Sequence, residues 1–407
     1  MIHTRILGVI EGFYGTPWSH QNRLSCIDFL AEHGWNTYVW AAKLEPRHRE
    51  KWNEPFTPEE LSQFSELSQR SSDVRVAVGL TPGDGATAAD VVAKLEPAVS
   101  AGCEVVVLCF DDLPVLHAAQ QHRTLAHSVR EALSCPVWIV PTHYAGTEGS
   151  EYLTALCDGL HDSIEVMWTG NTVVTDSITL NDARARMSVT GGRPPLVWDN
   201  TPVNDARMRG HLHMGPFVGR DPGLVDVCSG FLLNPMEEFA ASLPTLVSAV
   251  AWSRGDDAVA GWGNYVDAHG TRSLAEATSY RGDAHWPGDA PSREWWETVA
   301  NMTVVDPQTE AWANAAREGA RLALAALSVL ESDDTMSDRD RNVALFQLMG
   351  WGEHRARAHR TLGAGPRVRP VATQDGNGRF VLRAESVQES ESLVDRLVSD
   401  ALRRLRG

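Results

Sequence analysis

The feature that most constrains the fold is a regular alternation of short apolar runs with segments of helical periodicity. Eight runs are expected to be strands, and they lie near Ile6–Ile10, Thr37–Trp40, Arg75–Leu80, Val105–Phe110, Val137–Val140, Glu165–Trp168, Leu196–Trp198 and Phe231–Leu233. Runs without polar alternation suit strands that are covered on both faces, as in a parallel sheet. Eight successive βα units predict an α/β protein with a (β/α)8 TIM-type barrel.

The intervals between these runs carry helix signals. Thr57 is a good N-cap because Pro58 and two acidic residues follow it. Thr87–Ala101 and His117–Leu133 are rich in Ala, Leu and Val. A doubly wound open sheet is the competing architecture, but no Gly-rich phosphate-binding fingerprint follows the first strand.

The composition changes after about Asp283. His285–Pro291 is typical of a turn-rich joint. Helical periodicity returns in three segments, Glu310–Leu330, Asp338–Leu362 and Glu385–Leu405, with a loop-like stretch at Gly363–Gly378. We therefore predict a (β/α)8 barrel over residues 1–283 and a C-terminal helical domain over residues 284–407. The last, amphipathic helix is expected either to pack on this bundle or to bind a partner, and a homodimer through the C-terminal helices is one such arrangement.

Charge and composition narrow the class of protein. The 36 basic and 53 acidic residues give a net charge of −17, which argues against nonspecific binding of nucleic acid or anionic membranes. No apolar stretch is long enough to cross a membrane. The six Cys form no Cys-x-x-Cys pair and lie mostly in apolar contexts, as in a reducing compartment. No signal peptide is visible before the first strand, so we expect a cytoplasmic location.

Two adjacent carboxylates end the fourth apolar run, at Asp111 and Asp112. Neighbouring side chains of a regular strand point to opposite faces, so these two share a pocket only where the strand breaks. Leu113-Pro114 predicts that break. An Asp pair at such a place is often a helix cap or a solvated loop. The alternative is general acid–base chemistry, in which crowded carboxylates take different protonation states.

Polar, aromatic and Gly residues follow all eight predicted strands. The segments concerned are Glu11–Trp18, Ala41–Leu44, Thr81–Gly83, Asp111-Asp112, Pro141–Thr147, Trp168–Gly170, Trp198–Asn200 and Asn234-Pro235. The active sites of TIM barrels lie at the carboxyl ends of the strands. Eight such ends would be an odd coincidence if the residues were purely structural.

Taken together, these motifs resemble glycoside hydrolase family 84, which comprises retaining β-N-acetylglucosaminidases and includes the O-GlcNAcases. The resemblance covers about residues 5–255, and the C-terminal part resembles the helical bundle that follows the barrel in this family. The matching residues are Gly8–Gly15 with Pro17-Trp18, Asn36–Tyr38, Lys43, Phe110–Asp112, Pro141-Thr142 with Tyr144 and Gly146-Thr147, Trp168–Gly170, Trp198–Asn200 with Asn204-Asp205, and Asn234-Pro235.

The resemblance implies substrate-assisted catalysis. An ordinary retaining glycosidase places two carboxyls about 5–5.5 Å apart across the sugar, which suits adjacent Asp residues poorly. Instead the 2-acetamido oxygen of the substrate would attack the anomeric carbon. Asp111 would accept the acetamido N–H, while Asp112 would serve first as general acid and then as general base. Tyr144 would hold the acetamido oxygen, Trp198 would form a wall of this pocket, and Asn200 would lie nearby.

The resemblance also implies contacts to the sugar ring. Asp205 and Asn234 match ligands of sugar hydroxyls, for which carboxylates and amides are suited. Lys43 would reach a ring hydroxyl as a charged donor. Gly12 would offer its backbone carbonyl where a side chain would collide. The implied partner is a substrate that contains N-acetylglucosamine, either a glycoside or a glycoprotein.

No cofactor and no metal are expected. His143 follows the fifth strand, but no His-x-x-x-His group accompanies the acids, and His211-Leu-His213 is better explained as a polar helix end than as a ligand pair. Glu11 is expected to be structural because a turn follows it. Two alternatives stay open, namely a barrel that binds N-acetylglucosamine without cleaving it and a metal-dependent hydrolase that uses the Asp pair.

Overall fold

The structure is a computed structural model. It describes residues 5–112, 118–278, 291–303, 306–332, 336–357, 367–370, 373–375, 379–381, 387–390 and 393–406. The predicted strand break at Leu113-Pro114 and the predicted helix start at His117 lie outside the described residues.

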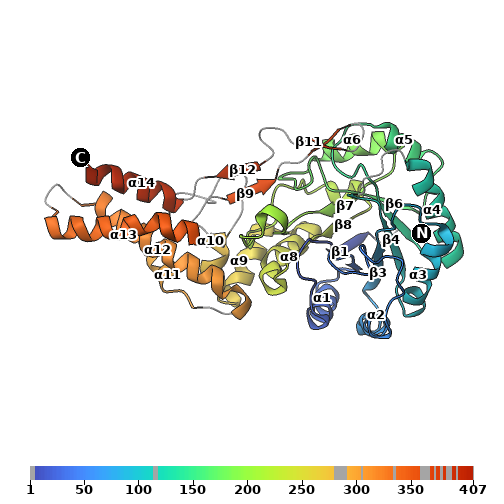
Figure 1. Cartoon of the computed structure of the whole chain (residues 1–407), viewed down its shortest axis with the longest axis horizontal. Coiled ribbons are helices and arrows are strands. Elements are labelled where there is room, and N and C mark those ends of the chain that lie inside the picture. The colour runs from blue at the N-terminus through green and yellow to red at the C-terminus, as the bar shows by residue number, and fades with distance from the viewer. Residues whose placement is uncertain are drawn as a thin grey trace.

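Eight parallel strands form a closed barrel in sequence order, which confirms the TIM-type prediction (Figure 1). The strands are β1 (Ile6–Glu11), β2 (Thr37–Trp40), β3 (Arg75–Leu80), β4 (Val105–Cys109), β5 (Val137–Val140), β6 (Glu165–Trp168), β7 (Leu196–Asp199) and β8 (Gly230–Leu233). β8 pairs with β1, with Leu7 opposite Phe231, and this closure rules out the open-sheet alternative.

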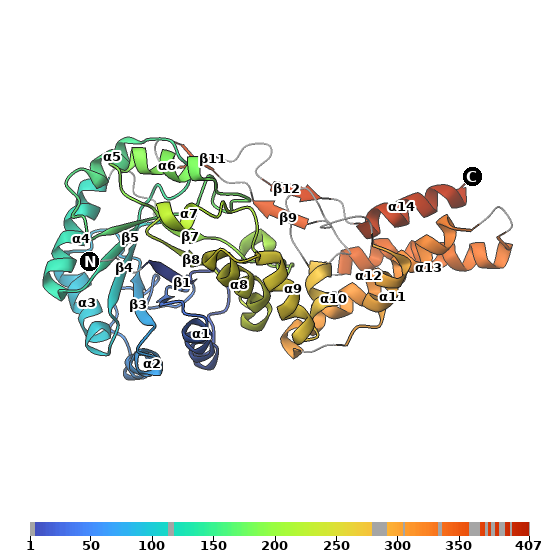
Figure 2. The same cartoon turned by 180° about the vertical axis from the view of Figure 1, so that it is seen from behind.

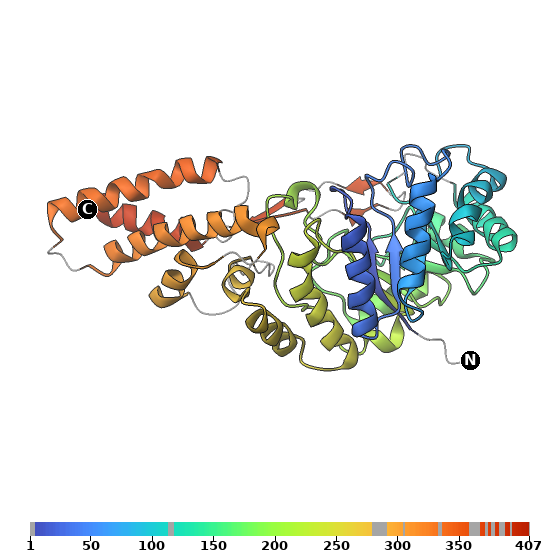
Figure 3. The same cartoon turned by 90° about the horizontal axis from the view of Figure 1, so that it is seen from below.

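Helices form an outer ring around the barrel and cover its strands (Figures 1 and 3). They are α1 (His20–Glu32), α2 (Pro58–Arg70), α3 (Ala88–Ser100), α4 (Ala119–Leu133), α5 (Glu151–Cys157), α6 (Leu180–Val189), the 3-10 turn η1 (Ala206–Met208), α7 (Leu224–Val227) and α8 (Phe239–Arg254). Thr57 begins α2 with a capping box to Glu60, as its sequence predicts. All five residues of β4 are buried. A strand buried on both faces has a continuous apolar sequence, which is why such strands can be predicted.

The C-terminal helices extend to one side of the barrel (Figure 2). They are α9 (Ala258–Ala268), α10 (Arg272–Thr278), α11 (Arg293–Ala300), the 3-10 turn η2 (Pro307–Thr309), α12 (Glu310–Leu330), α13 (Asp338–Arg357) and α14 (Leu393–Arg406). The prediction for α12 is confirmed at both ends. The prediction for α13 is confirmed as far as Arg357, and residues 358–362 lie outside the described part.

Two predictions in this region are wrong in detail. The expected helix from Glu385 begins only at Leu393, because β12 (Val387–Ser390) pairs antiparallel with β9 (Arg367–Pro370). The expected loop therefore contains β9, and it also contains β10 (Thr373–Gln374), which pairs with β11 (Phe380–Val381). Such short strands are fixed by a distant partner and leave no local periodicity.

The barrel and the C-terminal helices share packing. The core of the helical part includes Leu212, Met214 and Met236 from the barrel side. Trp262 of α9 donates its indole N–H to the carbonyl of Met214 at 2.7 Å. The expected boundary between residues 283 and 284 lies outside the described residues. Among the helices that the structure describes, none is both long and apolar enough for a bilayer.

Candidate active site

All nine residues that the sequence predicts for the site line one cavity of about 540 Å³. They follow strands β1, β2, β4, β5, β7 and β8, so the closed ring brings them together at its carboxyl end. They are Gly12, Lys43, Asp111, Asp112, Tyr144, Trp198, Asn200, Asp205 and Asn234. A cavity of this size suits a small ligand such as one sugar unit.

Asp111 lies at the end of the buried strand β4 and is only 5% exposed. Its Oδ2 accepts a hydrogen bond from Lys43 Nζ at 2.5 Å. Burial lowers the pKa of Lys43, but the acidic groups around it, Asp111 foremost, together outweigh burial and raise this pKa. Asp111 Oδ1 is buried and has no hydrogen-bond partner among the described residues. A buried oxygen of this kind is suited to a donor that the ligand brings.

Asp112 lies in the turn that follows β4. Its φ is 55°, in the left-handed region that a residue other than Gly seldom adopts. Tyr144 donates its hydroxyl to Asp112 Oδ1 at 3.0 Å, and Tyr14 donates to Oδ2 at 2.7 Å. Burial and the nearby carboxylates of Asp112 and Asp111 raise the pKa of Tyr144, so this hydroxyl stays a donor at neutral pH. The two adjacent carboxylates thus have different partners, as acid–base chemistry requires.

Asn200 ties three parts of the pocket together. Its Oδ1 accepts from the Trp198 indole at 2.9 Å and from Asn234 Nδ2 at 2.8 Å. Its Nδ2 donates to the carbonyl of Val173 at 2.6 Å. Lys43 Nζ lies 5.2 Å from the centre of the Trp198 ring. Trp198 is therefore held as a fixed wall of the cavity.

Gly12 leaves space for that wall. An ideal Cβ at this position would lie 2.2 Å from Trp198 Cζ2, far inside contact distance. The Gly12 N–H donates to Asn234 Oδ1 at 3.1 Å and so joins the ends of β1 and β8. A side chain at position 12 would therefore collide with Trp198, while the expected contact of the Gly12 carbonyl with the sugar stays a prediction.

Asp205 lies in the loop after β7. Its Oδ2 accepts from the backbone N–H of Tyr14 at 2.7 Å. Burial raises the pKa of Asp205 above its ordinary value. Its place in the cavity wall fits the implied contact with sugar hydroxyls.

Sequence reasoning missed two residues of the site. Tyr14 belongs to the motif after β1, but the sequence gives no reason to single it out from its neighbours. Arg49 lies in the loop after Lys43 and donates to the Tyr14 hydroxyl at 2.6 Å and to the Asp112 carbonyl at 3.0 Å. A contact between positions so far apart has no local signal.

Glu11 is structural, as predicted. It is fully buried and accepts hydrogen bonds from Arg23 and from the backbone N–H of Trp18, each at 2.9 Å. These contacts fix the turn that carries Gly12 and Tyr14. His143 Nδ1 lies 2.6 Å from Ser150 Oγ, and its ring packs on Tyr152. In the described part of the chain, no three His, Cys, Asp or Glu side chains gather in a metal-binding group.

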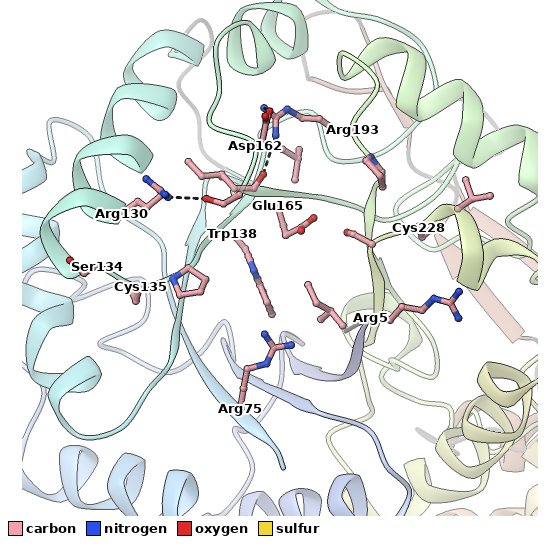
Figure 4. A pocket seen from close by; sticks show the side chains of 18 of the residues that line it. Arg5, Arg75, Arg130, Ser134, Cys135, Trp138, Asp162, Glu165, Arg193 and Cys228 are labelled. Carbon is pink, nitrogen blue, oxygen red and sulfur yellow. Dashed lines mark hydrogen bonds and ion pairs between the residues drawn. The ribbon is translucent and has the colours of Figure 1, made fainter. Parts of the chain in front are cut away.

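A second cavity, of about 920 Å³, opens at the other end of the barrel (Figure 4). It is lined by residues at or before strand starts, among them Arg5, Arg75 and Trp138. Its polar groups partly pair with each other, as Arg193 does with Asp162 at 3.5 Å. Its larger volume does not make it the catalytic site, because barrel chemistry lies at the carboxyl ends of the strands.

Comparison with known proteins finds relatives in sequence and in fold. Protein O-GlcNAcase of Rattus norvegicus and that of Mus musculus are each 29% identical over 273 residues, which is 61% of this chain and 30% of either relative. This chain thus matches under a third of the length of those proteins. A solved O-GlcNAc hydrolase mutant of Thermobaculum terrenum has a TM-score of 0.77 at 21% identity and covers 98% of this chain and 93% of its own. CpGH84B has a TM-score of 0.77 at 20% identity, with 98% of this chain and 77% of its own covered.

These two structures share the fold of this chain. A family model described as beta-N-acetylglucosaminidase matches residues 7–274, which includes every residue of the candidate site. The chain therefore belongs to the beta-N-acetylglucosaminidase family, and the resemblance to glycoside hydrolase family 84 is confirmed.

Proposed function

We propose that this chain is a retaining exo-β-N-acetylglucosaminidase that removes terminal β-linked N-acetylglucosamine by substrate-assisted catalysis. The observation that carries the proposal is the unequal environment of two adjacent carboxylates in one cavity. Asp111 presents a buried, unpartnered Oδ1 beside protonated Lys43. Asp112 is contacted by two tyrosine hydroxyls.

In the first step the acetamido oxygen forms a bond to the anomeric carbon while the glycosidic bond breaks. Asp111 Oδ1 accepts the acetamido N–H and stabilises the positive charge that develops there. Asp112 gives its proton to the leaving oxygen. The N–H proton passes to Asp111 Oδ1 as the ring closes, so the products of this step are a neutral oxazoline of the sugar and a free alcohol.

In the second step water opens the oxazoline. Asp112, now a carboxylate, takes a proton from the water as the water oxygen bonds to the anomeric carbon. The bond to the acetamido oxygen breaks, Asp111 returns its proton to the nitrogen, and the acetamide is restored. Two inversions at one carbon leave the β configuration unchanged, so the enzyme is retaining.

The test is hydrolysis of an aryl β-N-acetylglucosaminide by the wild type, Asp111→Asn and Asp112→Asn. Each variant is expected to lose on the order of 10²–10⁴-fold in kcat, the range for general acid–base groups. An N-trifluoroacetyl substrate should react far more slowly with the wild type, because its carbonyl oxygen is a weaker nucleophile. Unimpaired turnover in both variants, or a trapped covalent glycosyl–protein adduct, would refute the assignment.

The same assay separates the two alternatives. Product release contradicts a barrel that only binds the sugar, which would give a thermal shift without hydrolysis. Activity that survives a chelator contradicts a metal-dependent hydrolase that uses the Asp pair.

We infer that protein-linked O-GlcNAc is the natural substrate. The support is that the curated relatives are protein O-GlcNAcases. Faster release of the sugar from an O-GlcNAc peptide than from chitobiose would agree with this. The opposite preference would point to glycan or cell-wall fragments.

We further propose a homodimer through the C-terminal helices. Val343, Phe346 and Met349 lie on one face of α13 and are 50%, 80% and 64% exposed. Ala344 and Leu348 on the other face are buried in the helical core. Light scattering should give twice the chain mass, and Phe346→Glu should give the monomer. A wild type that stays monomeric contradicts the proposal.

A cytoplasmic location is likewise proposed. Its support is that all six cysteines are unpaired thiols, as in a reducing compartment. Cell fractionation tests it.

A further inference from the structure

A chain of three hydrogen bonds behind Asp112 has no role in the mechanism above. Arg49 Nη1 donates to the Tyr14 hydroxyl at 2.6 Å, and that hydroxyl donates to Asp112 Oδ2 at 2.7 Å. Arg49 Nη2 also donates to the backbone carbonyl of Asp112 at 3.0 Å. The guanidinium carbon lies 5.7 Å from the centre of the Tyr14 ring. One arginine thus contacts both the general acid and the tyrosine that holds it.

Building on the proposed function, we infer that Arg49 and Tyr14 are positioning residues that hold Oδ2 of Asp112 and reserve Oδ1 for the proton given to the leaving group. In this scheme Tyr144 occupies Oδ1 only until substrate binds. Asp112 Oδ2 therefore keeps its hydrogen-bond donor throughout, whereas Asp112 Oδ1 loses its donor when substrate binds.

The Oδ2 side is fixed from several directions. The Tyr14 backbone N–H donates to Asp205 Oδ2, and its hydroxyl oxygen accepts from Arg49. With that oxygen already accepting a bond, the single hydroxyl hydrogen points to Asp112. A charged donor behind the hydroxyl also strengthens the bond that the hydroxyl makes. Burial and the Asp112 carboxylate raise the pKa of Tyr14, so it stays a donor at the pH of catalysis.

The hydrogen bond to Asp112 Oδ1 can be lost on substrate binding because Tyr144 has only one hydroxyl hydrogen. It donates this hydrogen to Asp112 Oδ1 at 3.0 Å. The resemblance to family 84 implies that the same hydroxyl binds the acetamido oxygen of the substrate, and it cannot donate to both acceptors at once. Substrate binding therefore removes one donor from Oδ1, which favours a proton on that oxygen.

The charges around Asp112 set the direction of any pH effect. The cations near it are Arg49 and Lys43, and the acids are Asp111 and Asp205. Arg49 also secures the left-handed backbone of Asp112, whose φ is 55°. Arg49 is a cation beside the general acid, so removing its charge should move the basic limb of the pH–rate profile to higher pH.

The experiment compares two substrates that differ only in the leaving group. A phenyl glycoside needs protonation of its leaving oxygen, whereas a 2,4-dinitrophenyl glycoside does not. For Arg49→Met and Tyr14→Phe, kcat/KM is expected to fall roughly 10–100-fold with the phenyl substrate, a part of the full general-acid effect. The fall should be several-fold at most with the dinitrophenyl substrate. The basic limb of the pH profile should move to higher pH in Arg49→Met and stay in place in Arg49→Lys, which keeps the charge.

Arg47→Met is the matched control. It removes an arginine from the same loop, whose guanidinium pairs with Glu54 and Glu60 at 3.5 Å each. It should slow neither substrate selectively. Tyr14→Phe keeps the size of the ring, so it tests the hydrogen bond even where Arg49→Met folds poorly.

Equal slowing of both substrates with an unmoved basic limb would mean a structural role and would overturn the inference. A wild type inactive on every N-acetylglucosaminide would instead overturn the proposed function. The two failures are therefore distinguishable.

Discussion

Gly12 shapes the pocket by having no side chain. In Gly12→Ala the new Cβ would meet Trp198 at 2.2 Å, so the indole or the backbone must shift. Overpacking of this kind costs about 1–3 kcal/mol of folding free energy. We expect a lower Tm and a raised KM, measured by thermal unfolding and initial rates. Gly350→Ala is the control, because no atom lies within 4 Å of its ideal Cβ, and an equal effect there would contradict the steric argument.

Burial of Asp205 lowers the folding stability of the protein but places an acceptor for sugar hydroxyls in the cavity. Burial raises its pKa, so the folded state resists ionisation more than the unfolded state does. This penalty is absent below the unfolded pKa and is fully present above the folded pKa. Asp205→Asn removes it, so the difference in Tm between the variant and the wild type should grow from pH 3 to pH 7. Activity should fall because one acceptor for sugar hydroxyls is lost. A Tm difference that does not change with pH would contradict this account.

The residues that the sequence could identify are those tied to strand ends. Asp111, Asp112 and Tyr144 follow apolar runs, and the barrel rule places such residues in one site. Arg49 and Tyr14 escaped notice because their role arises from a hydrogen bond across 35 positions. Tertiary contacts of this kind have no signature in a single sequence.

At the scale of elements, the strands of the barrel were predicted to within one residue at either end. Their apolar runs can be recognised in the sequence because both faces of each strand are buried, as in β4. The strands β9, β10 and β12 were missed because they contain polar or charged residues in place of an apolar run, and β11 because it has only two residues. Each pairs with an antiparallel partner. The sequence therefore predicts the barrel far better than the segment that follows α13.

That segment reaches the active site. Gln374 of β10 donates to the carbonyl of Thr142 at 2.8 Å and accepts from the backbone N–H of Ala145 at 3.1 Å. These two bonds bracket Tyr144, whose hydroxyl contacts Asp112. The C-terminal region thus contributes to the positioning of a catalytic residue in the barrel.

Gln374→Leu tests this contribution. Each lost hydrogen bond is worth about 0.5–1.5 kcal/mol, so the loop that carries Tyr144 should open more often. We expect faster amide exchange at residues 142–145 and a several-fold lower kcat, with a small change in Tm. Gln69→Leu on exposed α2 is the control, since Gln69 bonds only Ser65 among the contacts described. Unchanged exchange would contradict the role of Gln374.

At the scale of the whole molecule, the hydrophobic core of the C-terminal helices packs against the barrel. Trp312 of α12 is 1% exposed, and its indole donates to the carbonyl of Gly210 in the barrel at 3.3 Å. Trp→Ala in a core costs about 3–5 kcal/mol. Trp312→Ala should therefore lower the midpoint of helix loss and the midpoint of activity loss together. The control is Val259→Ala on α9, where the side chain is 45% exposed. Two separate transitions, with activity surviving the first, would contradict this coupling.

The pairing of β8 with β1 also has a consequence for folding during protein synthesis. Gly12 and Asn234 touch across 222 positions of chain, so the sugar pocket has no precursor in any shorter fragment. A nascent polypeptide still lacking its eighth strand carries both acids yet has nowhere to seat a sugar. During synthesis on the ribosome, the proposed activity is therefore expected only after β8 has paired with β1.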